Sequence, residues 1–122
     1  MTTTNEKTTA TGSCLCGAVR FAVRGPLHPV SICHCAMCAR SATSVGAYTA
    51  CAPDDLAIEG RKLRWFRSSP VAERGFCSAC GSQLFWRRLG GDRVSVSAGS
   101  LDDPSGLVFG RHIITGGMRE GA

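Results

Sequence analysis

Seven of the eight cysteines in this 122-residue chain fall into three tight clusters. Thiolates one or two residues apart can reach the same metal ion, and zinc takes four such ligands in a tetrahedron. The spacing therefore predicts metal chemistry. The three clusters are Cys14-Leu15-Cys16, Cys33-His34-Cys35-Ala36-Met37-Cys38 and Cys77-Ser78-Ala79-Cys80.

Counting ligands divides the clusters into two sites. The outer pairs supply two thiolates each and complete one another, which makes a closed structural zinc site. The middle cluster supplies three thiolates and leaves one position open, as in a catalytic zinc site. We therefore expect two zinc ions per chain and a zinc enzyme. The closed site would consist of Cys14, Cys16, Cys77 and Cys80. The catalytic residues, acting through the second zinc, would be Cys33, Cys35 and Cys38.

The fourth position of the second site has two protein candidates. His34 lies between two of the ligands, and Cys51 follows Cys38 in a segment of small apolar residues. A lone cysteine in such a segment is more often a buried apolar residue than a ligand. If either side chain binds the metal, the second site is closed and the enzyme interpretation weakens.

Charge and composition limit the partners. Fourteen basic residues stand against nine acidic ones, a net charge of +5 that favours anionic partners. The basic residues form no run, so nucleic acid is an unlikely partner. No apolar stretch approaches the ~18 residues of a membrane span, and the first residues contain no secretory signal. We expect a cytoplasmic protein, without membrane contact, whose reduced thiols bind metal instead of forming disulfides.

The pattern between the clusters is that of an all-β domain. Apolar and polar residues alternate over 19–24, which predicts a half-buried strand. Hairpins are predicted from 56–59 with 63–67 and from 84–89 with 93–97, where Gly90-Gly91-Asp92 forms the turn. We expect a disordered tail over residues 1–11, a single zinc-binding domain over 12–115 and a flexible tail over 116–122.

The order of these motifs resembles the glutathione-dependent formaldehyde-activating (GFA) family, which includes centromere protein V. The resemblance implies an MSS-four-like fold, a zinc-stabilised β-sandwich of short antiparallel strands, with the same division of zinc ligands. It also implies a carbon–sulfur lyase, similar to S-(hydroxymethyl)glutathione synthase, that joins glutathione to formaldehyde. The segments that carry the resemblance are 12–21, 33–38, 76–84, 98–104 and 112–113.

Such an enzyme needs a small-molecule thiol such as glutathione and a small aldehyde as partners. Bidentate arginine suits the carboxylates of glutathione. The arginines nearest in sequence to the middle cluster or to the late hairpin are Arg40, Arg87, Arg88 and Arg111. The alternative function is a non-catalytic zinc-binding β domain that recognises a protein or nucleic acid, in which Trp65 and Trp86 could stack on a ligand.

Overall fold

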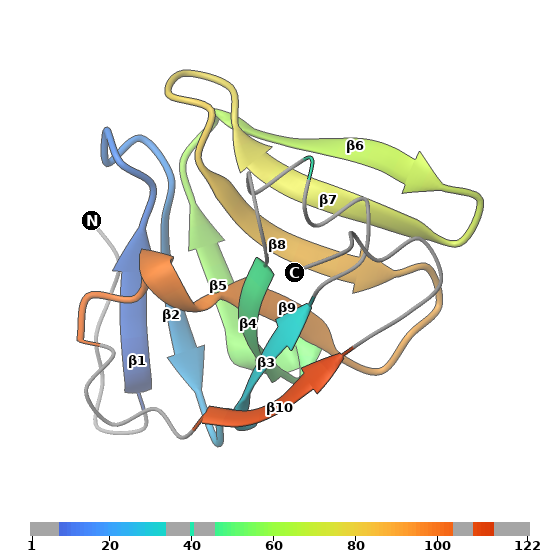
Figure 1. Cartoon of the computed structure of the whole chain (residues 1–122). Helices are drawn as coiled ribbons and strands as arrows, with labels where there is room; N and C mark the ends of the chain where they lie inside the picture. Colours follow the sequence, from blue (N-terminus) through green and yellow to red (C-terminus); the bar gives the residue numbers. More distant parts are fainter. Residues whose placement is uncertain (1–7, 34–39, 41–45, 104–108, 114–122) are drawn as a thin grey trace.

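The computed structural model describes residues 8–33, 40, 46–103 and 109–113. These residues form two β-sheets (Figure 1) and two short 3-10 turns, η1 and η2. The strands are β1 Thr8–Ser13, β2 Arg20–Arg24, β3 Val30–Cys33, β4 Gly46–Cys51, β5 Leu56–Glu59, β6 Leu63–Ser69, β7 Ala72–Cys77, β8 Gln83–Arg88, β9 Val94–Ser97 and β10 Phe109–Ile113. The turns are η1 Pro53–Asp55 and η2 Ala98–Ser100.

The two sheets differ in size. The small sheet has the order β1-β2-β5, and the large sheet has the order β10-β3-β4-β9-β8-β7-β6. Neighbouring strands run antiparallel throughout, except that β10 pairs in parallel with β3. The predicted all-β fold of short, mainly antiparallel strands is confirmed.

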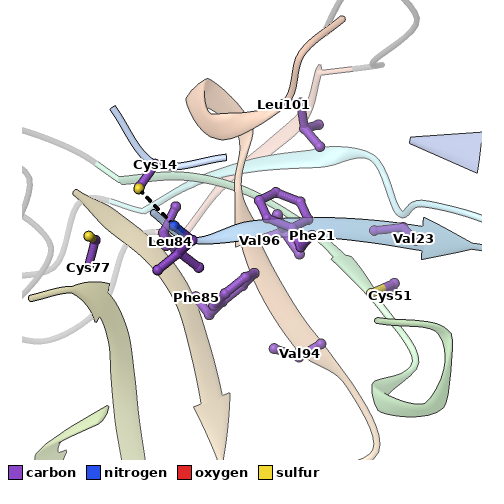
Figure 2. Packing of buried hydrophobic residues seen from close by; sticks show 11 residues of the cluster. Cys14, Phe21, Val23, Cys51, Cys77, Leu84, Phe85, Val94, Val96 and Leu101 are labelled. Atoms are coloured by element: carbon purple, nitrogen blue, oxygen red, sulfur yellow. Dashed lines mark hydrogen bonds between the residues drawn. The ribbon is translucent and has the colours of Figure 1, made fainter. Parts of the chain in front are cut away.

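Aromatic rings from both sheets meet in the core. Phe21 of β2 packs edge-to-face on Phe85 of β8, with ring centroids 5.2 Å apart. Trp65 of β6 stacks against Phe85 at 6.1 Å. Gly75 lies in β7 between the two ring-bearing strands, and a Cβ there would approach both rings to 3.1–3.2 Å. The missing side chain lets the rings of Trp65 and Phe85 close over β7. Aliphatic side chains and thiols lie around Phe21 and Phe85 (Figure 2).

Of the two hairpins predicted from the sequence, the structure contains one. The strand at 19–24 and the β8–β9 hairpin are confirmed. The hairpin between 56–59 and 63–67 is wrong, because β5 pairs with β2 whereas β6 pairs with β7. Gly60, between the two strands, takes a φ of +112° and packs on the carbonyl of Ala18. At this glycine the chain leaves the small sheet and enters the large one.

The boundary of the predicted N-terminal tail is also wrong. Strand β1 begins at Thr8, so residues 8–11 belong to the small sheet. Their threonines are ordinary edge-strand residues that find polar partners. Thr9 Oγ1 donates to the carbonyl of Gly25 at 2.6 Å, and Thr11 Oγ1 donates to Asp102 at 2.7 Å. Residues 1–7 and the predicted tail at 116–122 lie outside the described residues.

A substitution at Gly12 would test how tightly β1 packs on the core. A Cβ at this position would collide with the ring of Phe21 and would lie 2.5 Å from the carbonyl oxygen of Ser100. We expect Gly12→Ala to lower the free energy of unfolding by about 1–3 kcal/mol, the usual cost of overpacking. Urea denaturation of the metal-loaded protein measures this. Gly99→Ala is the matched control, because a Cβ there meets open space; equal urea midpoints for the two variants would contradict the packing described.

Candidate metal centre

Four cysteines that are distant in sequence come together in the structure. The sulfur atoms of Cys14, Cys16, Cys77 and Cys80 all lie within 4.8 Å of one another. The Cys14–Cys16 sulfurs are 3.7 Å apart, and the Cys16–Cys77 sulfurs are 3.8 Å apart. A tetrahedron with Zn–S bonds of about 2.3 Å has sulfurs about 3.8 Å apart. The cluster could therefore bind a metal ion, and its donor set and spacing fit zinc.

Two similar turns present these thiols. The carbonyl of Cys14 accepts a hydrogen bond from Gly17 at 3.2 Å, and the carbonyl of Cys77 accepts one from Gly81 at 2.7 Å. Gly17 and Gly81 have φ values of +80° and +81°, in the left-handed region that favours glycine. The glycine after each cysteine pair thus closes a turn that directs both thiols to one point.

The cluster joins the two sheets. Cys14 directly follows β1 of the small sheet, whereas Cys77 ends β7 of the large sheet. Both side chains are buried and contribute to the apolar core (Figure 2). A metal held here connects the small sheet to the edge region of the large one.

Hydrogen-bond donors surround the sulfurs. The backbone N–H of Val19 donates to Cys14 Sγ at 3.3 Å, the dashed line in Figure 2. Ser82 Oγ accepts from the N–H of Leu15 at 3.0 Å and lies 3.1 Å from Cys80 Sγ. The serine hydroxyl therefore links the first turn to the second, and it can donate to the Cys80 thiolate. The sequence analysis missed Ser82, because its partner Leu15 is 67 residues away in the chain.

These donors favour ionisation of two of the thiols. The hydroxyl and the backbone of Ser82 lower the pKa of Cys80 to about 5. Burial raises the pKa of Cys14, but the Val19 N–H and the neighbouring thiols outweigh burial, and the net shift is downward. Both groups are therefore biased toward the thiolate form that binds metal.

Ionising the cluster further requires a cation. The backbone N–H of Ala18 lowers the pKa of Cys16, but burial and the three other thiols outweigh it and raise that pKa to about 11. Like charges at this separation disfavour one another. A divalent cation removes the conflict, because a coordinated thiol is deprotonated outright.

The middle cluster is only partly within the described residues. Cys33 is the last residue of β3, half-buried, and it pairs with Gly46 of β4 and Ile113 of β10. His34, Cys35 and Cys38 lie outside the described residues. The three-cysteine site therefore stays a prediction.

The position of Cys51 removes it as a ligand for that site. Cys51 lies at the end of β4, opposite Val94, five residues from Gly46 and so about 17 Å along the strand. Its side chain is fully buried in the apolar cluster, where burial and the nearby charge of Asp55 raise the pKa of the thiol to about 11. This separation is too large for Cys51 and Cys33 to bind one metal ion together, and it favours the interpretation of Cys51 as a core residue.

Among the described side chains of the arginines proposed to bind glutathione, Arg87 and Arg88 lie at the Val94 end of β8 and β9. Arg87 forms an ion pair with Glu73 at 2.6 Å and lies 3.7 Å over the ring of Trp65. Arg87 and Arg88 line a cavity of about 460 Å³ that also includes Val94, the partner of Cys51. Arg40 is exposed, and the side chain of Arg111 lies outside the described part of the structure.

A different arginine, Arg74, is buried. It is 7% exposed, and its Nη1 donates to Tyr48 Oη at 3.4 Å. The sequence analysis missed this residue, although Arg74 stands two positions from both Ala72 and Phe76, in the same place of the strand's alternation. An arginine at a position where the alternation of a strand calls for an apolar residue indicates a charge on an enclosed face of the sheet.

Ser82→Ala should weaken metal binding at the four-cysteine cluster. It removes the hydroxyl next to Cys80, and loss of such an outer contact commonly reduces metal affinity about 10–100-fold. Competition with a chromophoric chelator measures the affinity. Ser78→Ala is the control, since Ser78 is exposed on the same turn; equal affinities for the two variants would show that the hydroxyl has no such role.

Cys51→Ala should leave the metal content unchanged. We expect a small loss of stability, about 1 kcal/mol, from the smaller side chain in the core. Elemental analysis of the purified variant, compared with Cys16→Ala, measures the content. A metal loss in Cys51→Ala as large as that in Cys16→Ala would contradict the placement of Cys51.

Comparison with known proteins identifies a family and several relatives of this chain. Residues 9–116 match the family described as glutathione-dependent formaldehyde-activating enzyme. An uncharacterized lyase of Schizosaccharomyces pombe is 30% identical over 80 residues, which cover 66% of this chain and 58% of the lyase. A putative glutathione-dependent formaldehyde-activating enzyme of Halomonas elongata is 34% identical over 83 residues, which cover 61% of this chain and 53% of that enzyme. The chain thus spans just over half the length of these curated relatives.

The fold has a solved counterpart. The crystal structure of a Rhodobacter sphaeroides protein superimposes with a TM-score of 0.67 at 23% identity, covering 84% of this chain and 99% of that one. Among the described residues, no helix is both long and apolar enough to cross a membrane. The match over residues 9–116 takes in the four-cysteine cluster and, apart from Thr8 at the start of β1, all the described strands. The chain belongs to the glutathione-dependent formaldehyde-activating enzyme family.

Proposed function

We propose that this protein is a zinc-dependent carbon–sulfur lyase, similar to S-(hydroxymethyl)glutathione synthase, that joins glutathione to formaldehyde. The observation that carries the proposal is the closed geometry of the four-cysteine cluster. This cluster accounts for four of the seven clustered thiols, and Cys51 lies about 17 Å along β4 from the partner of Cys33. Family membership and the names of the relatives support the same reaction.

In this proposal the two metals have different roles. The zinc at Cys14, Cys16, Cys77 and Cys80 is structural, and Cys33, Cys35 and Cys38 hold the second zinc. When bound, that zinc supplies a cation that stabilises a substrate thiolate near neutral pH and can polarise a carbonyl. The surrounding chain binds the substrate thiol and holds it next to the aldehyde.

The overall reaction is an addition. The glutathione sulfur forms a bond to the formaldehyde carbon, and the π electrons of the carbonyl move to oxygen. The proton released by the thiol ends on that oxygen, so that the product is a hydroxymethyl thioether. No oxidant or reductant is required. We propose a cytoplasmic location, because clustered thiols that bind metal are typical of a reducing compartment.

Thiols also add to formaldehyde without a catalyst, so the test must compare rates and not only product formation. Exchange spectroscopy measures these rates. NMR exchange between free glutathione and its hydroxymethyl adduct should be faster with the metal-loaded protein than without it. Cys35→Ser should return the exchange to the uncatalysed rate, while Cys51→Ser is the control cysteine substitution. An uncatalysed rate with the fully loaded wild-type protein would contradict the enzyme and favour the binding-domain alternative.

The two metal sites should also respond differently to substitution. We expect two zinc ions per wild-type chain and one in Cys35→Ser, which should remain folded. Cys77→Ser should unfold the domain, because structural zinc contributes on the order of 10 kcal/mol or more in small zinc domains. Elemental analysis and circular dichroism measure both properties. If Cys35→Ser unfolds as completely as Cys77→Ser, the second site is structural as well.

A further inference from the structure

A cavity of about 460 Å³ lies between the small sheet and one end of the large sheet. Leu56 and Ile58 of β5 line it from the small sheet, and Trp65 of β6 and Val94 of β9 line it from the large sheet. Ligand sites in proteins commonly have volumes of about 300–1,000 Å³, apolar walls and a few convergent polar groups. The size and the walls of this cavity therefore fit a small organic molecule.

The cavity is separate from the four-cysteine cluster. Glu73 of β7 lines the cavity, whereas Cys77 ends the same strand four residues later, about 13 Å further along. Arg87 lines the cavity near the end of β8, whereas Cys80 precedes the start of that strand. A molecule bound in the cavity therefore lies away from the metal-binding thiols.

The cavity begins where the apolar face of the large sheet ends. Phe85 and Val96 are paired across β8 and β9, and the next pair on the same face is Arg87 with Val94. Glu73 of β7 is in turn paired with Arg87. The row of side chains beyond the aromatic core therefore places a carboxylate and a guanidinium next to an aliphatic residue.

Positive charge predominates in the cavity. Its described lining contains three arginines and one acidic residue, Glu73. The Nε and Nη2 atoms of Arg87 lie 2.8 and 2.6 Å from Glu73 Oε1, and its guanidinium lies 3.7 Å over the ring of Trp65. The side chains of Arg88 and Arg93 form no ion pair or hydrogen bond with any residue that the structure describes. Two guanidinium groups are thus available to a ligand.

We propose that this cavity binds a small amphipathic carboxylate, a molecule that combines an apolar chain or ring with one carboxylate group. The carboxylate binds Arg88 and Arg93, because a guanidinium presents paired N–H donors that match a carboxylate. The contact between Arg87 and Glu73 is an interaction of the same kind within this cavity. Charge complementarity therefore selects an anion over a neutral molecule of the same shape.

The apolar part of the ligand covers side chains that are otherwise in contact with water. Ile58 and Leu89 both line the cavity and are 37% and 38% exposed. Removing apolar surface of this kind from water is the main favourable contribution to binding an apolar chain. This inference is independent of the proposed function, because it concerns neither thiols nor metal.

Octanoate and octanol test the proposal, because they share an eight-carbon chain and differ in the charge of the head group. Isothermal titration calorimetry with the metal-loaded protein should show octanoate binding about 10-fold or more tightly than octanol. Arg88→Gln and Arg93→Gln should each weaken octanoate binding about 3–10-fold, since exposed charges are partly screened by water. Octanol binding should change less than about twofold in both variants.

Arg61→Gln is the matched control for charge. Arg61 precedes Lys62, whose carbonyl accepts a hydrogen bond from Ser78 in the second cysteine turn, and Arg61 does not line the cavity. Its substitution should change octanoate binding less than about twofold. Ile58→Ser is the control for the apolar wall, and it should weaken octanoate and octanol by the same factor, about 3–10-fold.

NMR locates the site, because the indole N–H signal of Trp65 should shift when octanoate binds. Circular dichroism should be the same in all variants; if one of the two cavity arginine variants does not fold, the other decides.

Three results would overturn the proposal. The first is that octanoate does not bind at millimolar concentration, and the second is that it binds no more tightly than octanol. The third is an equal loss of octanoate affinity in Arg61→Gln and in the two cavity variants, because net charge would then attract the anion. All three leave the proposed function standing, since that function is tested by exchange between glutathione and its adduct.

Discussion

Four thiols that cannot all ionise without a cation connect the two sheets of this protein. The turn after β1 and the turn after β7 each contribute two of them, at the end of the core where Cys14 and Cys77 are buried. Local donors favour the thiolate at Cys80 and Cys14, whereas Cys16 resists ionisation next to its neighbours. Binding a cation resolves that conflict, so metal affinity and folding free energy are coupled in this domain.

The four-cysteine cluster lies at one end of the core. The two faces of the large sheet differ in the side chains that they carry. One face packs on the small sheet through Phe85, on which Trp65 stacks, while the opposite face carries Cys33, Tyr48 and Arg74. Membership of a fold therefore constrains the core more directly than it constrains the chemistry of the opposite face.

The sequence predicts the cysteine pairing well because the information is local: each turn places two thiols, and tetrahedral coordination supplies the rule that joins the turns. Alternation likewise locates β2, β8 and β9. Alternation identifies strands but not their partners, and for that reason β5 and β6 were assigned to one hairpin although they belong to different sheets. Ser82 was missed for a related reason, since its role depends on a contact with Leu15 that only the folded chain creates.

Sequence proximity to a cysteine cluster also says little about the surroundings of an arginine. Arg87 is close in sequence to the second cysteine pair, but it is partly exposed and already engaged by Glu73 and the Trp65 ring, so water and a carboxylate weaken its field. Arg74 has the same side chain three residues before Cys77, yet it is enclosed and directed across two strands toward Tyr48. The strength of a charge–charge interaction depends on the surrounding dielectric more than on the residue type. Burial, which only the fold determines, therefore sets how strongly the charge of each arginine acts on its surroundings.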